Sequence, residues 1–124
     1  MRLPFKIGIS PLLKIRGVIA DKDIKKNTII ERCPVVLNTI EKRKPLEETI
    51  LSEYYFDYTN KFDAIVFGYG SLLNHSFKPN CEIYYDYKNK NCIIKTIKNI
   101  KKGEELTHKY MNKKELKLYS EYKI

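Results

Sequence analysis

The length and composition of this chain predict one compact globular domain. Its 124 residues have room for a single domain, which buries roughly two thirds of the surface that the unfolded chain exposes. Hydrophobic residues make up 43% and aromatic residues 12%, with ten tyrosines and no tryptophan. This supply of apolar side chains is enough to form a core without metal ions or disulfide bonds. The composition therefore excludes a disordered chain and a second domain, and it predicts one domain over residues 1–124.

The chain carries a large positive charge. Lys and Arg number 24 against 15 Asp and Glu, which gives a formal net charge of +9 and an isoelectric point near 9.4. A field of this sign favours nucleic acid as a partner. The lysines are scattered along the chain together with many Asn, Ile and Tyr residues, so a general compositional bias explains the charge at least as well.

The three cysteines and the N-terminal segment indicate an intracellular protein. Cys33, Cys81 and Cys92 are odd in number and include no Cys-x-x-Cys pair, which disfavours both a disulfide framework and a zinc site. The first residues carry no apolar run of the length that a signal peptide or a membrane span requires. We therefore expect reduced thiols, a cytoplasmic or nuclear location, no bound metal and no membrane.

Short runs of β-forming residues dominate the pattern. A proline within a strand typically marks an edge strand or a bulge, so Pro34 predicts one of these for its own strand. The turn-like sequence at 88–91 separates two alternating runs and predicts a hairpin. The expected strands cover residues 7–9, 17–20, 28–37 across Pro34, 64–67, 81–87 and 92–98.

Two short helices are expected. Residues 46–54 place apolar side chains at helical spacing after Pro45, which suits a first turn. Near the C-terminus, Asn112 and Glu115 form a pair typical of a capping box, which predicts a short helix over residues 112–124.

Two turns have similar sequences, Ile-Lys-Lys-Asn-Thr-Ile at 24–29 and Ile-Lys-Lys-Gly-Glu-Glu at 100–105. Asn27 and Gly103 are residue types that tolerate a left-handed backbone. We interpret the echo as two similar turns rather than an internal repeat.

Two segments concentrate the residues that suit chemistry. Residues 68–80 read Gly-Tyr-Gly-Ser-Leu-Leu-Asn-His-Ser-Phe-Lys-Pro-Asn after an apolar strand, and loops so placed often carry function. Residues 102–107 read Lys-Gly-Glu-Glu-Leu-Thr, and Tyr110 follows three residues later.

In this order, with a hairpin between them, the segments resemble the signature motifs of SET-domain lysine methyltransferases. The sequence Arg-Gly-Val-Ile-Ala at 16–20 is similar to the N-terminal Gly-rich cofactor loop of that family, although Ile15 stands where members usually have another glycine. The resemblance covers about residues 3–111. It implies a mainly β fold of several small sheets with short helices and a C-terminal pseudoknot.

The resemblance also implies S-adenosylmethionine as the cofactor and a set of site residues. Tyr110 matches the catalytic tyrosine, whose hydroxyl lies where substrate amine and cofactor meet. Tyr54 or Tyr55 is expected to line the substrate channel, an aromatic helix face in the core being the alternative. His108, two residues before Tyr110, stands where many members have Phe or Tyr that helps limit how many methyl groups are added. The residues implied for cofactor binding are Arg16, Gly17, Asn74, His75 and Tyr110.

The predicted function is methyl transfer to a lysine side chain in a protein, with histone tails as candidate substrates. The Cys-x-Cys zinc cluster that follows many histone-directed SET domains is absent from this sequence. A basic tail would be repelled by a +9 chain unless Glu53, Asp57 and Asp63 gather at the channel mouth. The remaining positive surface could then contact nucleosomal DNA, and a homodimer is a further candidate assembly. The alternative function is a non-catalytic SET-like module that binds chromatin or nucleic acid.

Overall fold

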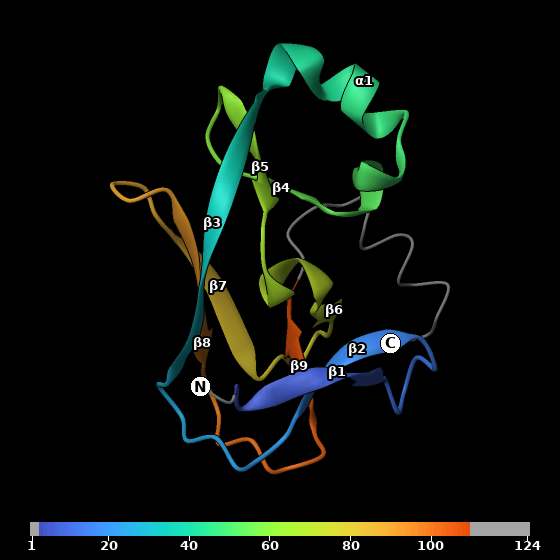
Figure 1. Ribbon diagram of the computed structural model, residues 1–124, viewed down its shortest axis with the longest axis vertical. Helices are drawn as coiled ribbons and strands as arrows, with labels where there is room; N and C mark the ends of the chain where they lie inside the picture. Colours follow the sequence, from blue (N-terminus) through green and yellow to red (C-terminus); the bar gives the residue numbers. More distant parts are fainter. Residues whose placement is uncertain (1–2, 110–124) are drawn as a thin grey trace.

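The computed structural model describes residues 3–109, and two β-sheets make up most of this part of the chain (Figure 1). The four-stranded sheet has the order β1-β2-β9-β6 and the five-stranded sheet the order β4-β5-β3-β8-β7. The strands are β1 (Phe5–Ile9), β2 (Arg16–Ala20), β3 (Ile29–Thr39), β4 (Tyr55–Asp57), β5 (Phe62–Val66), β6 (Asn74–His75), β7 (Cys81–Asp86), β8 (Asn91–Thr96) and β9 (Glu105–His108).

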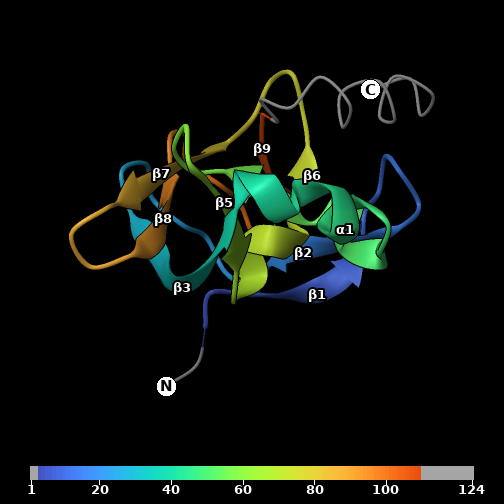
Figure 2. The same ribbon diagram turned by 90° about the horizontal axis from the view of Figure 1, so that it is seen from above.

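The four-stranded sheet brings distant parts of the sequence together. β1 and β2 form an antiparallel hairpin, β9 pairs with β2, and β6 pairs in parallel with β9. The two sheets lie beside each other, and the β7–β8 hairpin projects away from β1 and β2 (Figures 1 and 2). This arrangement places both sequence motifs next to the strand that carries Gly17.

The core lies between the sheets. Val18 of β2 and Leu106 of β9 are fully buried, and they share one apolar cluster with Cys33 and Ile94 of the larger sheet. A buried aliphatic side chain contributes roughly 1.5–3 kcal/mol. This shared core fixes the larger sheet against the strands that carry the motifs.

The strand that contains Pro34 is not an edge strand, contrary to the prediction. β3 occupies the middle of the five-stranded order, and it changes partner along its length. Residues 29–34 pair with β8, whereas residues 35–39 pair with β5. Because pairing with β5 begins one residue after Pro34, the missing N–H removes no bond from that ladder. The register of β3 against β8 does shift, but the shift lies between Ile29 and Glu31.

The helix expected at 46–54 is also different in the structure. An α-helix, α1 (Arg43–Glu47), begins earlier and is followed by a separate 3₁₀ turn at Ile50–Glu53. The Thr49 side chain accepts a hydrogen bond from the backbone N–H of Leu51 and so starts the second turn. Ile50 is 71% exposed, so the helical spacing of apolar residues does not produce one buried helix face. A 3₁₀ turn at Ile40–Lys42 precedes α1, and another covers Tyr69–Leu72.

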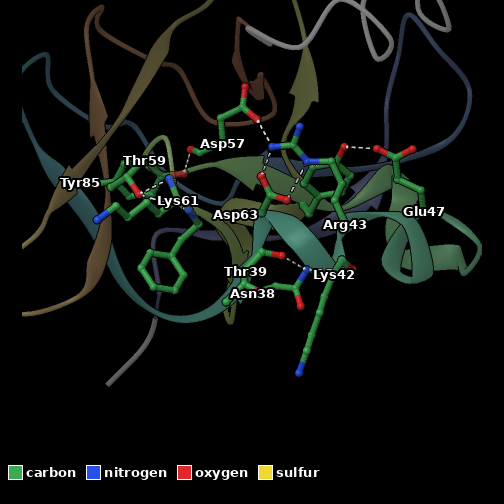
Figure 3. A network of polar contacts seen from close by, with 12 residues as sticks. Asn38, Thr39, Lys42, Arg43, Glu47, Asp57, Thr59, Lys61, Asp63 and Tyr85 are labelled. Carbon is green, nitrogen blue, oxygen red and sulfur yellow. Dashed lines mark hydrogen bonds and ion pairs between the residues drawn. The ribbon is translucent and has the colours of Figure 1, made fainter.

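An ion pair attaches the helical segment to the larger sheet (Figure 3). Arg43 of α1 donates two hydrogen bonds to the fully buried Asp63 of β5, at 2.9 Å from Nε and 2.7 Å from Nη2. These bonds raise the pKa of the Arg43 guanidinium above its ordinary value. Nearby, the Tyr55 hydroxyl donates to Glu47 of the same helix. The charge of Asp63 is therefore used inside the fold and does not lie at a channel mouth.

The hairpin and the two similar turns agree with the sequence predictions. β7 and β8 pair in register from Cys81–Thr96 to Asp86–Asn91. Asn27 and Gly103 adopt positive φ angles of 65° and 92°. In the described part of the chain, no helix is both long enough and apolar enough to cross a membrane.

Replacement of Arg43 by Met should destabilise the fold by about 2–4 kcal/mol, because it leaves the buried Asp63 carboxylate without its cation. Urea denaturation measures the loss. Lys42→Met is the matched control, since Lys42 is adjacent and exposed, and it should change stability by less than about 0.5 kcal/mol. Equal stability of the two variants would contradict the anchoring role of Arg43.

Candidate active site

The candidate site is built where β6 and β9 lie side by side. Asn74 pairs with Thr107 and His75 with His108, and the Ser76 N–H donates to the His108 carbonyl at 3.0 Å. The first motif therefore contacts the second through the backbone. Since β9 also pairs with β2, the strand that begins at Arg16 joins the same sheet.

Asn74 is held by its side chain between two of these strands. Its amide Nδ2 donates to the Arg16 carbonyl at 2.9 Å and to Oε2 of Glu105 at 2.8 Å. The other oxygen of Glu105 accepts from the Ser10 hydroxyl at 2.5 Å, and Ser10 Oγ accepts from the Leu13 N–H. Glu105 thus fixes both Asn74 and the turn between β1 and β2.

Gly17 is required by this packing. A Cβ atom at Gly17 would lie 2.5 Å from Glu105 Oε2 and 3.0 Å from Asn74 Nδ2, distances that the carboxylate and the amide could not keep. The glycine therefore allows the Asn74 side chain to reach the β2 backbone. Ile15, at the position where another glycine was expected from the resemblance, is 36% exposed, and its carbonyl accepts the Ser10 N–H at 2.7 Å.

Asn80 holds the other edge of β9. Its Nδ2 donates to the Glu105 carbonyl at 2.8 Å, and its Oδ1 accepts the Thr107 N–H at 2.9 Å. An asparagine side chain here supplies the donor and the acceptor that a neighbouring strand would supply. The Pro-Asn end of the first motif thereby positions the second motif.

The two histidines are buried and uncharged at neutral pH. Burial, with a smaller contribution from the nearby His75, lowers the pKa of His108 to about 3. Burial also lowers the pKa of His75, with a smaller effect from Lys109. The His75 ring packs edge-on against the Phe77 ring, with 4.4 Å between ring centroids. The ring centroids of His108 and Phe56 are 5.9 Å apart. Imidazoles with lowered pKa values are weak proton acceptors, so neither histidine suits a role as general base.

The two candidate channel tyrosines have different surroundings. Tyr55 begins β4, is 4% exposed and donates to Glu47, and burial raises its pKa to about 12. Tyr54 is half-buried, and its hydroxyl accepts from Nη2 of Arg16 at 3.2 Å. Tyr54 therefore contacts β2 at Arg16, the residue whose carbonyl binds the Asn74 amide. Tyr55 instead contacts α1 at Glu47.

A further carboxylate holds the glycine loop before the first motif. Oε1 of Glu31 accepts from the Tyr69 N–H and from the Cys33 thiol, both at 2.9 Å. Gly68, at φ 156°, brings its backbone against Cys33, where an added Cβ would lie 2.6 Å from Sγ. This contact fixes the start of the loop that ends at Asn74.

The cysteines lie in the core. All three are free and buried, and burial raises the pKa values of Cys81 and Cys92 to about 12. Thiols that stay protonated are poor metal ligands. Among residues 3–109, no three side chains of His, Cys, Asp or Glu gather as a metal ion would require.

The predicted catalytic Tyr110 and the helix expected at 112–124 lie outside the described residues. The predicted pseudoknot also depends on the segment after Lys109. Within residues 3–109, the structure brings together Arg16, Gly17, Asn74, His75 and His108. Sequence reasoning did not single out Ser10, Glu105 or Asn80. Glu105 and Asn80 lie within the two motifs, and this position was the signal that could have identified them. The sequence around Ser10 contains no comparable signal.

The two motifs pair in parallel and share a sheet with the Gly17 strand, so the described residues that the SET-domain resemblance assigned to cofactor binding lie close together. The sequence pattern of the SET domain matches residues 15–111, and the chain belongs to this family.

Similar proteins include known enzymes. An H3 lysine-37-specific histone-lysine N-methyltransferase of Schizosaccharomyces pombe is 34% identical over 100 residues, which are 78% of this chain and 67% of that protein. Human histone-lysine N-methyltransferase 2D is also 34% identical, over 103 residues that are 76% of this chain but 2% of that protein. A crystal structure of a Plasmodium falciparum protein, provisionally assigned as a histone methyltransferase, has a TM-score of 0.69 at 34% identity. The structural match covers 89% of this chain and 95% of the Plasmodium chain.

These findings confirm the predicted family, the mainly β fold and the activity of a protein-lysine methyltransferase. Membership of the family implies the use of S-adenosylmethionine. The roles of the individual site residues stay predictions.

Replacement of Glu105 by Ala should lower stability by about 2–3 kcal/mol, because Asn74 and Ser10 each lose a hydrogen bond to a carboxylate. Glu105→Gln is the matched control. Its carbonyl can accept from Asn74 while its amide donates to Ser10, so most of the stability should be retained. Urea denaturation measures both variants, and a Gln variant as damaged as the Ala variant would contradict the arrangement.

Stability should fall with acid because of His108. The pKa of His108 is about 3 in the folded chain and about 6.5 in the unfolded chain. Below pH 6.5, His108 therefore binds a proton in the unfolded chain but not in the folded chain. From pH 6 to pH 4 this one group should cost about 2–3 kcal/mol. In the His108→Phe variant that part of the loss should vanish when urea denaturation is repeated at both pH values. An unchanged pH dependence would show that His108 does not carry it.

Proposed function

We propose that this chain methylates a lysine in a histone, with S-adenosylmethionine bound along the Arg16–Gly17 strand and the Asn74–His75 strand. The observation that carries the proposal is the parallel pairing of β6 with β9. It joins the predicted cofactor residues to the strand that leads to Tyr110. The named relatives act on histones, which supports the same class of substrate.

The side chains at this place fit the proposed cofactor. S-adenosylmethionine carries an ammonium and a carboxylate at its amino-acid end. The Arg16 guanidinium suits a carboxylate, and the carboxylate of Glu105 lies beside Asn74 in the same sheet. When bound, the cofactor supplies an electrophilic methyl group on a sulfonium. Asn74 would contact its amino-acid end, and the backbone of His75 would hold the adenine.

Tyr110 is the proposed catalytic residue. Its hydroxyl would hold the lysine nitrogen in line with the methyl group, and alignment of this kind is the main contribution such a site makes. His75 and His108 stay neutral, so they add no positive charge near a cationic substrate. Tyr54 is the proposed channel residue, whereas Tyr55 donates its hydroxyl to Glu47 of α1.

The histone proposal also implies a location in the cell. A histone substrate would require the chain to enter the nucleus. We retain one SET domain over residues 1–124 as the proposed organisation, with a core of about 3–111. A homodimer stays a prediction.

Tyr110→Phe should lose most methyl transfer to a histone H3 peptide, because the hydroxyl that orients the amine is gone. It should still bind the cofactor, since the Arg16 and Asn74 contacts remain. Transfer is measured with labelled S-adenosylmethionine, and binding is measured as the rise in melting temperature with the demethylated product.

Tyr84→Phe is the control, because Tyr84 is 41% exposed on β7. It should keep both activities. Full transfer by the Tyr110 variant would refute its role, and no thermal shift in the unmodified chain would refute cofactor binding.

A further inference from the structure

The two similar lysine-rich turns are joined in space. Ile24 and Ile100 form an isolated antiparallel bridge, with N–H to O distances of 2.7 Å and 2.8 Å. We call residues 22–27 and 98–103 the lysine ribbon. These twelve residues contain six lysines and one acidic residue, Asp23. Six positive charges less one negative charge give +5, more than half of the net charge of the chain.

The bridge divides the lysines of the ribbon into two groups. Because the two segments run antiparallel, three lysines lie beyond each end of the Ile24–Ile100 pair. One group contains Lys25, Lys26 and Lys98, and the other contains Lys22, Lys101 and Lys102; all six are exposed. More than half of the net charge of the chain is therefore gathered on two paired segments.

Hydrogen bonds hold the backbone of the ribbon in place. The Lys26 N–H donates to Oδ1 of Asn99 and the Lys102 N–H to Oδ1 of Asp23, both at 2.9 Å. The Thr96 hydroxyl donates to the Lys25 carbonyl at 2.7 Å. Glu104, which directly follows the ribbon, accepts the Lys101 N–H at 3.0 Å. A second acidic group therefore lies near the lysines. The lysines thus extend from a fixed backbone, which reduces the entropy lost on binding.

The apolar residues of the ribbon narrow the choice of partner. Ile24 is 5% exposed and Ile100 is 1% exposed, so the ribbon has no apolar group to insert into a lipid layer, which surface-bound segments generally use. Charge is therefore its main means of binding. A row of phosphates matches two groups of lysines on a rigid backbone, and neutralised phosphates release counterions.

We propose that the lysine ribbon binds the phosphate backbone of double-stranded DNA. This inference rests on the proposed function, since DNA is the polyanion that accompanies a histone substrate. The ribbon lies at one end of the molecule and α1 at the other (Figure 1). Bound DNA at the ribbon therefore leaves the α1 end uncovered.

The test compares two variants that lose the same charge. The ribbon variant carries Lys25→Gln, Lys26→Gln, Lys101→Gln and Lys102→Gln. The control variant carries Lys42→Gln, Lys44→Gln, Lys61→Gln and Lys88→Gln, all at exposed positions away from the ribbon. Binding to a fluorescent DNA duplex of roughly 20 base pairs is measured by anisotropy from low to moderate salt, without cofactor.

The ribbon variant should bind at least tenfold more weakly than the control at low salt. Its slope of log affinity against log salt should be shallower by about 2 to 4, since each lost phosphate contact removes about 0.9. No DNA binding by the unmodified chain, or equal losses in the two variants, would overturn the proposal. So would binding to phosphatidylserine vesicles that matches DNA binding at the same salt and is lost in the ribbon variant.

Methylation of a free H3 peptide separates this proposal from the proposed function. Both variants should methylate the peptide as the unmodified chain does, because neither changes a residue of the site. A loss of peptide methylation confined to the ribbon variant would overturn the ribbon as a surface separate from the site. If the unmodified chain binds DNA through the ribbon but methylates no histone peptide, the histone proposal fails and the ribbon stands.

Discussion

The structure depends on how β9 is held. This strand of four residues pairs with β2 on one side and with the two-residue β6 on the other. Pairing so short is weak by itself, and side chains complete it. Asn80 adds two hydrogen bonds to the β9 backbone, and Glu105 of β9 ties Asn74 and Ser10 to it. The two motifs are therefore parts of one hydrogen-bonded unit, in which each supplies partners to the other.

That unit explains why polar residues dominate a place where apolar ones could pack. Asn74 is 5% exposed, and its side-chain amide donates hydrogen bonds to a carbonyl and to a carboxylate. Buried polar groups that are bonded in this way specify one arrangement, because any shift leaves a donor or an acceptor without its partner. An apolar core would tolerate a small slip of β6 against β9. A methyl-transfer site that works by alignment could not.

Local patterns in the sequence predicted the hairpin and the turns but not strands β4 and β6, whereas the family resemblance predicted the fold class. Alternation and turn residues were enough for the hairpin of β7 and β8, and residue type was enough for the left-handed Asn27 and Gly103. Pro34 misled because its missing N–H falls where β3 changes partner, which depends on residues far along the chain. The spacing in 46–54 misled because Thr49 caps a separate turn. The motifs indicated Asn74 and His75 through the family resemblance, but the part of Ser10 depends on a contact across 95 positions that no local pattern reveals.

The buried thiols give the chain a natural reporter of opening. Cys33, Cys81 and Cys92 lie on the three adjacent strands β3, β7 and β8, and each is at most 1% exposed. A thiol reagent reaches such groups when the strands separate, so the rate of labelling follows the opening of the larger sheet. The smaller sheet contains no cysteine in the described residues. Because Cys81 bonds to the Thr107 backbone of β9 and Cys33 shares an apolar cluster with Leu106, labelling of these thiols also follows the separation of the two sheets.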